Sequence, residues 1–133
     1  MFKAFKMLGE FAALLVLLVS QPSYAVDLTK LPMLEHGDIS ISNDNPGSFT
    51  LYITPDRCAQ REVKVASKES VAVRCPGAKS VSVFYIIVDA AGKPHERRQI
   101  LEVDNHYGFG WDEELKSYVR LIRLFDDKGR IVR

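Results

Sequence analysis

The stretch Val81-Ser82-Val83-Phe84-Tyr85-Ile86-Ile87-Val88 is the longest β-branched and aromatic run outside the first 25 positions. It begins as an alternation of apolar Val81 and Val83 with polar Ser82, and it is apolar at every position from Phe84 onward. This pattern predicts a β-strand that enters a core at one edge and is then buried on both faces. Asp89-Ala90-Ala91-Gly92 follows and supplies the turn residues that a hairpin needs. We therefore expect a central strand and hairpin around which the fold is built.

Period-two alternation recurs on both sides of this central strand and predicts further short strands. Segments rich in Asn, Asp, Pro and Gly separate them at intervals typical of all-β domains. The additional predicted strands are centred on residues 39–41, 49–53, 63–65, 71–75, 97–103, 107–111 and 118–125. Seven or eight short strands indicate a small antiparallel β-sandwich, immunoglobulin-like in the loose sense, or a small barrel.

The segment from Asp112 to Phe125 is compatible with two structures. Its apolar residues fit helical spacing, and Asp112 followed by two glutamates would suit a helix N-terminus. Residues 118–125, however, are rich in strand formers. They also end in Asp126-Asp127-Lys128-Gly129, which repeats the Asp-x-x-Gly pattern after the central strand. We therefore predict a turn followed by a strand.

Residues 1–25 have the three parts of a secretory signal peptide: lysines 3 and 6, an uninterrupted apolar run at 11–19, and small residues Ser23 and Ala25 before the cleavage point. The apolar run is too short for the alternative, a transmembrane anchor, which needs about 20 apolar residues. We expect cleavage after Ala25, an N-terminal arm at 26–36 and a single β-domain at 37–133. The protein is therefore predicted to be exported to the periplasm or the extracellular space, without stable membrane insertion.

Residues 26–133 contain equal numbers of basic and acidic side chains. Nucleic-acid and anionic-membrane binders need a positive field, so this balance argues against both classes. The last short segment carries Arg130 and Arg133, charges that discourage strand pairing at an edge. We expect a monomer or weak dimer.

The two cysteines, Cys58 and Cys75, are predicted to form a disulfide, the usual state of an isolated pair in an oxidising compartment. The alternatives are a metal site or a reactive thiol. A metal site would need histidines nearby, and His36, His95 and His106 are scattered along the sequence. We predict no metal and no cofactor.

The sequence contains no Gly-x-Ser-x-Gly, His-Glu-x-x-His, phosphate-loop or Cys-x-x-Cys motif. We therefore expect a non-catalytic accessory, inhibitor or immunity-type module that binds another envelope or secreted protein, or a ligand. Two alternatives stay open: a subunit of an envelope or secretion assembly joined by edge strands, and a small hydrolase or metal-dependent enzyme with an unrecognised site.

The predicted binding residues are Tyr107, Phe109 and Trp111, together with Arg97 and Arg98. The three aromatics share one parity, and Gly108 and Gly110 leave the opposite side bare for a partner backbone. Aromatic residues and arginine are favoured in binding hot spots. The alternative is that these aromatics fill the core, since aromatics dominate cores as well as interfaces.

Overall fold

The computed structural model describes residues 27–132. The predicted signal peptide, residues 1–25, lies outside them. A short 3-10 helix, η1, precedes eight strands in this part of the chain. The elements are η1 (Leu28–Lys30), β1 (Ile39–Asn43), β2 (Phe49–Pro55), β3 (Arg61–Val65), β4 (Glu69–Val73), β5 (Ser80–Val88), β6 (Pro94–Glu102), β7 (Asn105–Asp112) and β8 (Ser117–Arg123).

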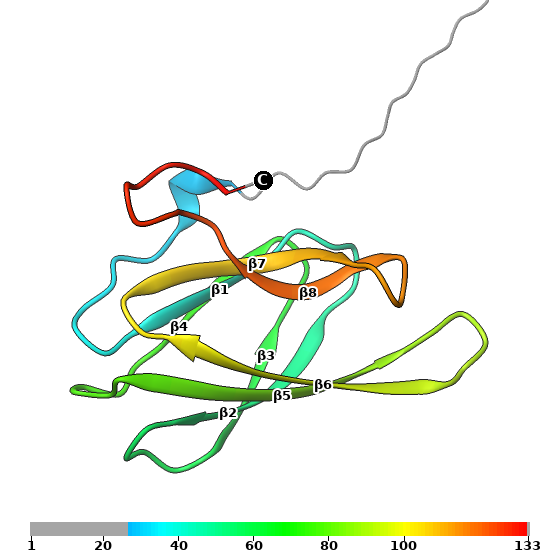
Figure 1. Cartoon of the computed structure of the whole chain (residues 1–133), viewed down its shortest axis with the longest axis horizontal. Helices are drawn as coiled ribbons and strands as arrows, with labels where there is room; N and C mark the ends of the chain where they lie inside the picture. The colour runs from blue at the N-terminus through cyan, green and yellow to red at the C-terminus, as the bar shows by residue number, and fades with distance from the viewer. Residues whose placement is uncertain (1–26, 133) are drawn as a thin grey trace, which may run out of the picture.

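The strands form two four-stranded sheets, which lie as two layers in Figure 1. The strand order is β4-β1-β7-β8 in one sheet and β3-β2-β5-β6 in the other. All neighbouring strands are antiparallel except β1 and β7, which run parallel. This architecture confirms the predicted small β-sandwich, with β5 in the interior of its sheet.

The core lies between the sheets and is built from the alternating positions of the strands. Ile39 and Ile41 of β1 face Leu51 and Ile53 of β2, and all four side chains have no exposed surface. Tyr85 of β5 is also buried, and its hydroxyl donates to the Val119 carbonyl oxygen at 2.7 Å. Burial raises the pKa of Tyr85 to about 12, so this buried donor stays protonated.

The prediction that β5 is buried on both faces is wrong. Val81, Val83 and Tyr85 point into the core, whereas Ile86 is 50% exposed and Val88 is 63% exposed on the opposite side. The reason is that the sandwich has two layers, so nothing in residues 27–132 forms a third layer over this sheet. An apolar residue on the outer parity of β5 therefore faces solvent.

The Cys58–Cys75 disulfide is confirmed. Cys58 lies in the β2–β3 connection and Cys75 follows β4, so the bridge joins one sheet to the other. Gly37 packs against this segment with a φ of +97°, and a Cβ atom there would collide with the Cys75 carbonyl oxygen. Both the positive φ and the lack of space require glycine at this position.

The segment after β7 is a turn and a strand, as predicted. Asp112 Oδ1 accepts hydrogen bonds from the backbone N–H groups of Glu114 and Leu115, each at 3.0 Å, and so forms the turn. β8 ends at Arg123, two residues before the predicted end, and Phe125 forms only an isolated bridge with Ile131.

Candidate binding surface

The structure divides the five predicted binding residues among four places. Tyr107 and Phe109 are core side chains, each 3% exposed. Phe109 stacks on Phe49 with ring centroids 3.9 Å apart and meets the Tyr85 ring edge-on at 6.2 Å. These two aromatics hold the sheets together, as the core alternative predicted for them.

Trp111 faces outward although it shares the parity of Phe109. A register shift between Gly110 and Trp111 in the β7–β8 ladder changes the side on which the following residue lies. Trp111 is 45% exposed, packs edge-on against Tyr118 at 5.1 Å, and donates from Nε1 to Glu113 at 2.8 Å. Simple alternation could not locate this irregularity.

The predicted open space beside the glycines is occupied at Gly110. A Cβ atom at this position would lie 2.6 Å from Cδ1 of Ile122, whose side chain covers the glycine from β8. Gly110 therefore provides room for a neighbouring strand of the same sheet, and the expectation that a partner backbone approaches there is wrong.

Arg97 is committed to an ion pair that links the two sheets. Its Nε donates to Asp112 Oδ2 at 2.8 Å, and its Nη2 donates to Asp112 Oδ1 at 3.2 Å and to Glu114 at 2.7 Å. The Asp112 side chain is 7% exposed and the Arg97 side chain 18% exposed. The hydrogen bonds from Arg97 hold the pKa of Asp112 below its ordinary value. This contact fixes the β7–β8 turn over β6.

Arg98 lies on the outer side of the β3-β2-β5-β6 sheet, away from the other four residues. Its guanidinium carbon stands 4.4 Å from the centroid of the Phe84 ring, and its side chain is 72% exposed. The Phe84 ring in turn lies 6.1 Å from that of Tyr52, its partner on β2. Cation–π contact over the ring face orients Arg98 without removing it from solvent.

Exposed apolar residues extend this row in both directions along β5 and β6, with Ile86 and Val88 toward the β5–β6 turn and Ile100 away from it. Ile100 on β6 is 77% exposed, and Ile86 and Val88 on β5 are the other large members. We define the β5–β6 face as these three residues with the row beside them: Tyr52, Phe84, Ile86, Val88, Arg98 and Ile100. A shallow hollow of about 440 Å³ lies between its members Tyr52, Phe84, Arg98 and Ile100, with Thr54 and Gln60 at its border.

Sequence reasoning missed this face because it assigned the apolar residues of β5 to the interior. A signal was present in the sequence of β6, where Glu96, Arg98 and Ile100 occupy one parity. Two charges on one parity indicate a solvent-facing side, and the register places Phe84 opposite Arg98 and Ile86 opposite Glu96. The outer position of Phe84 and Ile86 follows once that pairing is known.

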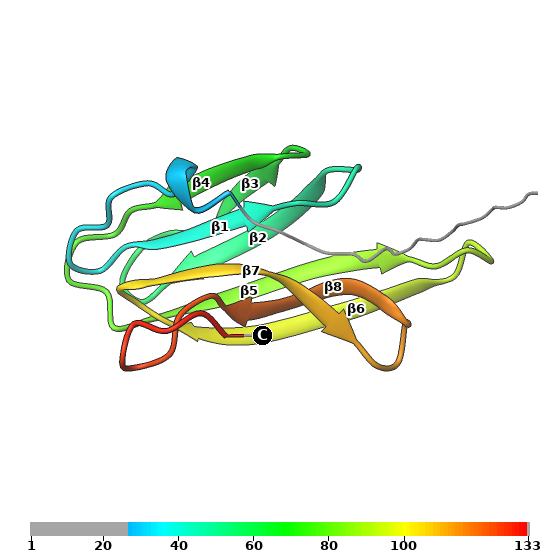
Figure 2. The same cartoon turned by 90° about the horizontal axis from the view of Figure 1, so that it is seen from above.

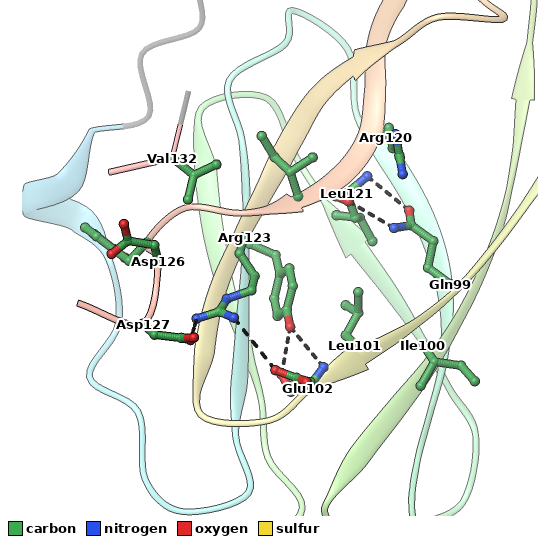
Figure 3. A pocket seen from close by; sticks show the side chains of 13 residues that line it. Gln99, Ile100, Leu101, Glu102, Arg120, Leu121, Arg123, Asp126, Asp127 and Val132 are labelled. Atoms are coloured by element: carbon green, nitrogen blue, oxygen red, sulfur yellow. Dashed lines mark hydrogen bonds and ion pairs between the residues drawn. The ribbon is translucent and has the colours of Figure 1, made fainter. Parts of the chain in front are cut away.

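A second hollow, of about 570 Å³, lies between β6 and β8 (Figure 3). Across it, side-chain groups form paired hydrogen bonds with backbone N–H and C=O groups, as neighbouring strands do in a sheet. The Gln99 amide donates to the Leu121 carbonyl at 2.9 Å and accepts from the Leu121 N–H at 3.1 Å. The Tyr107 hydroxyl accepts from the Glu102 N–H at 3.0 Å and donates to the Glu102 carbonyl at 2.8 Å. These contacts bridge the two sheets on this side of the sandwich.

Arg123 stands at the border of this second hollow. It contacts Asp127 at 3.0 Å and Glu102 at 3.8 Å, and its Nε is buried with no hydrogen-bond partner among residues 27–132. The Arg123 and Asp127 side chains are drawn in Figure 3.

Within residues 27–132, no three His, Cys, Asp or Glu side chains are grouped closely enough to hold a metal ion. The same residues contain no helix long and apolar enough to cross a membrane. Comparison of the chain with protein-family models, with curated proteins and with solved structures gives no match.

Proposed function

We propose that the chain is an exported, non-catalytic binding module that holds another envelope or secreted protein against its β5–β6 face. The observation that carries this proposal is the gathering of Tyr52, Phe84, Ile86, Val88 and Ile100 on one solvent-exposed side of a sheet. Contiguous exposed apolar surface on a soluble domain is typical of interaction sites.

The composition of this face supports a protein partner. Aromatic side chains and arginine are enriched among residues that dominate protein–protein affinity. Arg98 is held over Phe84 in advance, so less rotamer freedom is lost when a partner covers it. The Cys58–Cys75 bridge is compatible with an oxidising compartment and supports export.

Site-specific photo-crosslinking in the producing cell tests this proposal. A photoreactive phenylalanine analogue replaces the half-buried Tyr52 on the face, and a matched one replaces the exposed Lys116 in the β7–β8 turn. We expect one discrete adduct from position 52 and none from position 116. The adduct should disappear when Phe84→Ala is added. Equal labelling from both positions, or no adduct from either, would contradict the proposal.

A further inference from the structure

The four strands at the edges of the sheets differ in how well their outer backbone is covered. β3 and β4 have five residues each, whereas β6 has nine. On β8, the Gln99 amide bonds to the Leu121 backbone and the Tyr85 hydroxyl bonds to the Val119 carbonyl. β6 is therefore the long edge, and the question is how much of it is covered.

The ladder between β5 and β6 determines which groups of β6 point outward. At the hairpin, the Asp89 N–H donates to the Lys93 carbonyl, so the odd-numbered residues of β6 bond to β5. The N–H and C=O groups of residues 96, 98, 100 and 102 then face away from β5. Tyr107 occupies both groups of Glu102, and Arg97 Nη1 donates to the Glu96 carbonyl at 2.9 Å.

What is left open is the Glu96 N–H and both backbone groups of Arg98 and Ile100. Among residues 27–132 none of these groups has a recorded side-chain or loop partner. An uncovered row of this kind is a template for another strand. Figure 2 shows that the hairpin carrying it reaches beyond the rest of the sandwich.

We propose that β6 pairs with β6 of a second copy of this chain, antiparallel and about a two-fold axis at Arg97, so that two four-stranded sheets become one. In this register Glu96 lies opposite Arg98 of the second copy, and by symmetry the pair occurs twice. Ile100 lies opposite Pro94 of the second copy, and Val88 is the neighbour of that proline on β5. The pairing therefore joins opposite charges and covers two exposed apolar residues.

Neighbouring registers that keep the outward groups opposite each other are less favourable. Moving the axis to Arg98 places that arginine against itself, and moving it to Glu96 places that glutamate against itself. An axis at Gln99 opposes Glu96 to Glu102. An axis at Ile100 opposes Arg98 to Glu102, whose backbone groups are already bonded to Tyr107. The axis at Arg97 places no like charges opposite each other among the outward-facing residues. The Glu96 carbonyl oxygen, which already accepts from Arg97 Nη1, has a second lone pair for the Arg98 N–H of the second copy.

The axis at Arg97 brings the two Arg97 side chains near each other on the inner side of the sheet. Each one is already paired with Asp112 and with Glu114. Two carboxylates accompany each guanidinium, so the inner side of the junction carries no excess positive charge. The junction shares Arg98 and Ile100 with the β5–β6 face, but Tyr52, the crosslinking position, lies two strands away from it, so the two proposals are tested separately.

Sedimentation velocity on the exported protein, over a concentration series up to about 1 mM, measures the self-association. We expect a reversible dimer, weak because strand pairing alone buries little area. Glu96→Arg and Arg98→Glu should each raise the dissociation constant at least tenfold, since each creates two like-charge contacts. The double variant should return it to within about threefold of the original value, because it restores both pairs in reversed order.

Two further variants keep the proposal falsifiable. Lys64→Glu, an equivalent charge reversal on edge strand β3, should leave the dissociation constant unchanged. Ile100→Pro removes an outward N–H without breaking the ladder to β5, so it should abolish the dimer while thermal unfolding stays cooperative. Absence of a dimer over the whole series, a dimer insensitive to the single reversals, or failure of the double variant to restore pairing would overturn the proposal. Tyr52→Ser should leave the dimer intact. The dimer test and the crosslinking test can therefore give opposite outcomes.

Discussion

Individual residues in this sandwich have environments that neighbouring residues in the sequence do not share. Phe109 and Trp111 are two positions apart, yet one is 3% exposed and the other 45% exposed. The β-bulge between Gly110 and Trp111 separates them. A residue's parity in a strand therefore indicates its face only as far as the next irregularity.

The two aromatics should differ in their contribution to stability. Phe109→Ala removes a ring stacked in the core and should lower the free energy of unfolding by about 3–5 kcal/mol. Trp111→Ala removes one edge-on contact with Tyr118 and should cost about 1 kcal/mol. Chemical denaturation of both variants measures the difference. In the unaltered protein, acrylamide should quench the fluorescence of Trp111, the single tryptophan. A blue-shifted, unquenched emission would show that Trp111 is buried.

The Arg97–Asp112 pair should give the protein a specific sensitivity to acid. The folded-state pKa of Asp112 lies below the ordinary 3.8, so its stabilising contribution is present above that value and is lost as pH falls through the folded pKa. Asp112→Asn should therefore lower stability at pH 7 and flatten its decline below about pH 4. Arg97→Ala should cost about 3 kcal/mol at pH 7, because it leaves a buried carboxylate without its partner.

Urea unfolding at several pH values measures both effects. The control is Asp56→Asn, since Asp56 is exposed and its carboxylate forms no hydrogen bond or ion pair within residues 27–132. It should follow the parent protein at every pH. An unchanged acid slope in Asp112→Asn would show that the ion pair is not coupled to folding.

Two hairpin elements show that local sequence can specify a turn completely. Asp89 and Asp126 each open an Asp-x-x-Gly turn whose glycine has a positive φ. In both turns the Asp Oδ1 accepts from the N–H groups two and four positions later. The repeated pattern predicted a similar hairpin turn in both places, and the structure shows the same side-chain hydrogen bonds in each.

Other elements were predictable only in part. Alternation, runs of strand-forming residues and turn signals together located all eight strands, and the predicted export suggested the Cys58–Cys75 disulfide. The exposed side of β5 was not predictable from its own residues. An apolar side chain can face solvent or a further layer of structure, and the sequence of β5 alone does not distinguish the two. The predicted site residues lie in different places partly because of the strand pleat. Arg97 and Arg98 are adjacent in sequence, but the pleat directs them to opposite faces of the sheet.

The disulfide should stabilise the joint between the two sheets. Replacing both Cys58 and Cys75 by serine should lower the free energy of unfolding by about 3 kcal/mol, because the unfolded chain regains the freedom of a closed loop. Thermal unfolding of the two proteins measures the loss. Neither cysteine should react with an alkylating reagent in the native protein, and reaction of both would show that the bridge is absent.

The contact between β7 and β8 at Gly110 should be tight enough to show energetic coupling. Gly110→Ala places a methyl group against the Ile122 side chain and should cost about 1–3 kcal/mol. Adding Ile122→Ala removes the obstruction, so the combined loss should be smaller than the sum of the single losses. Denaturation of the four proteins in this cycle measures the coupling. Additive losses would show that the two positions do not touch.

At the scale of the whole molecule, side chains bridge the two sheets on one side of the sandwich, and the outer side of one sheet is exposed. Gln99, Tyr107 and Tyr85 join the two sheets through side-chain hydrogen bonds on the side where β6 and β8 lie. The outer side of the β3-β2-β5-β6 sheet presents the aromatic row and the exposed apolar residues of β5 and β6. Both proposals follow from this asymmetry, since the face and the β6 edge border one another.

Amide hydrogen exchange along β6, followed residue by residue by NMR, tests this account most directly. In dilute protein the amides of Arg97, Gln99 and Leu101, which bond to β5, should be protected, whereas those of Arg98 and Ile100 should exchange rapidly. On concentration, Glu96, Arg98 and Ile100 should gain protection together. Uniform protection along β6 at every concentration would show that the edge is already covered. Unchanged rapid exchange at Arg98 and Ile100 would show that no second strand pairs there.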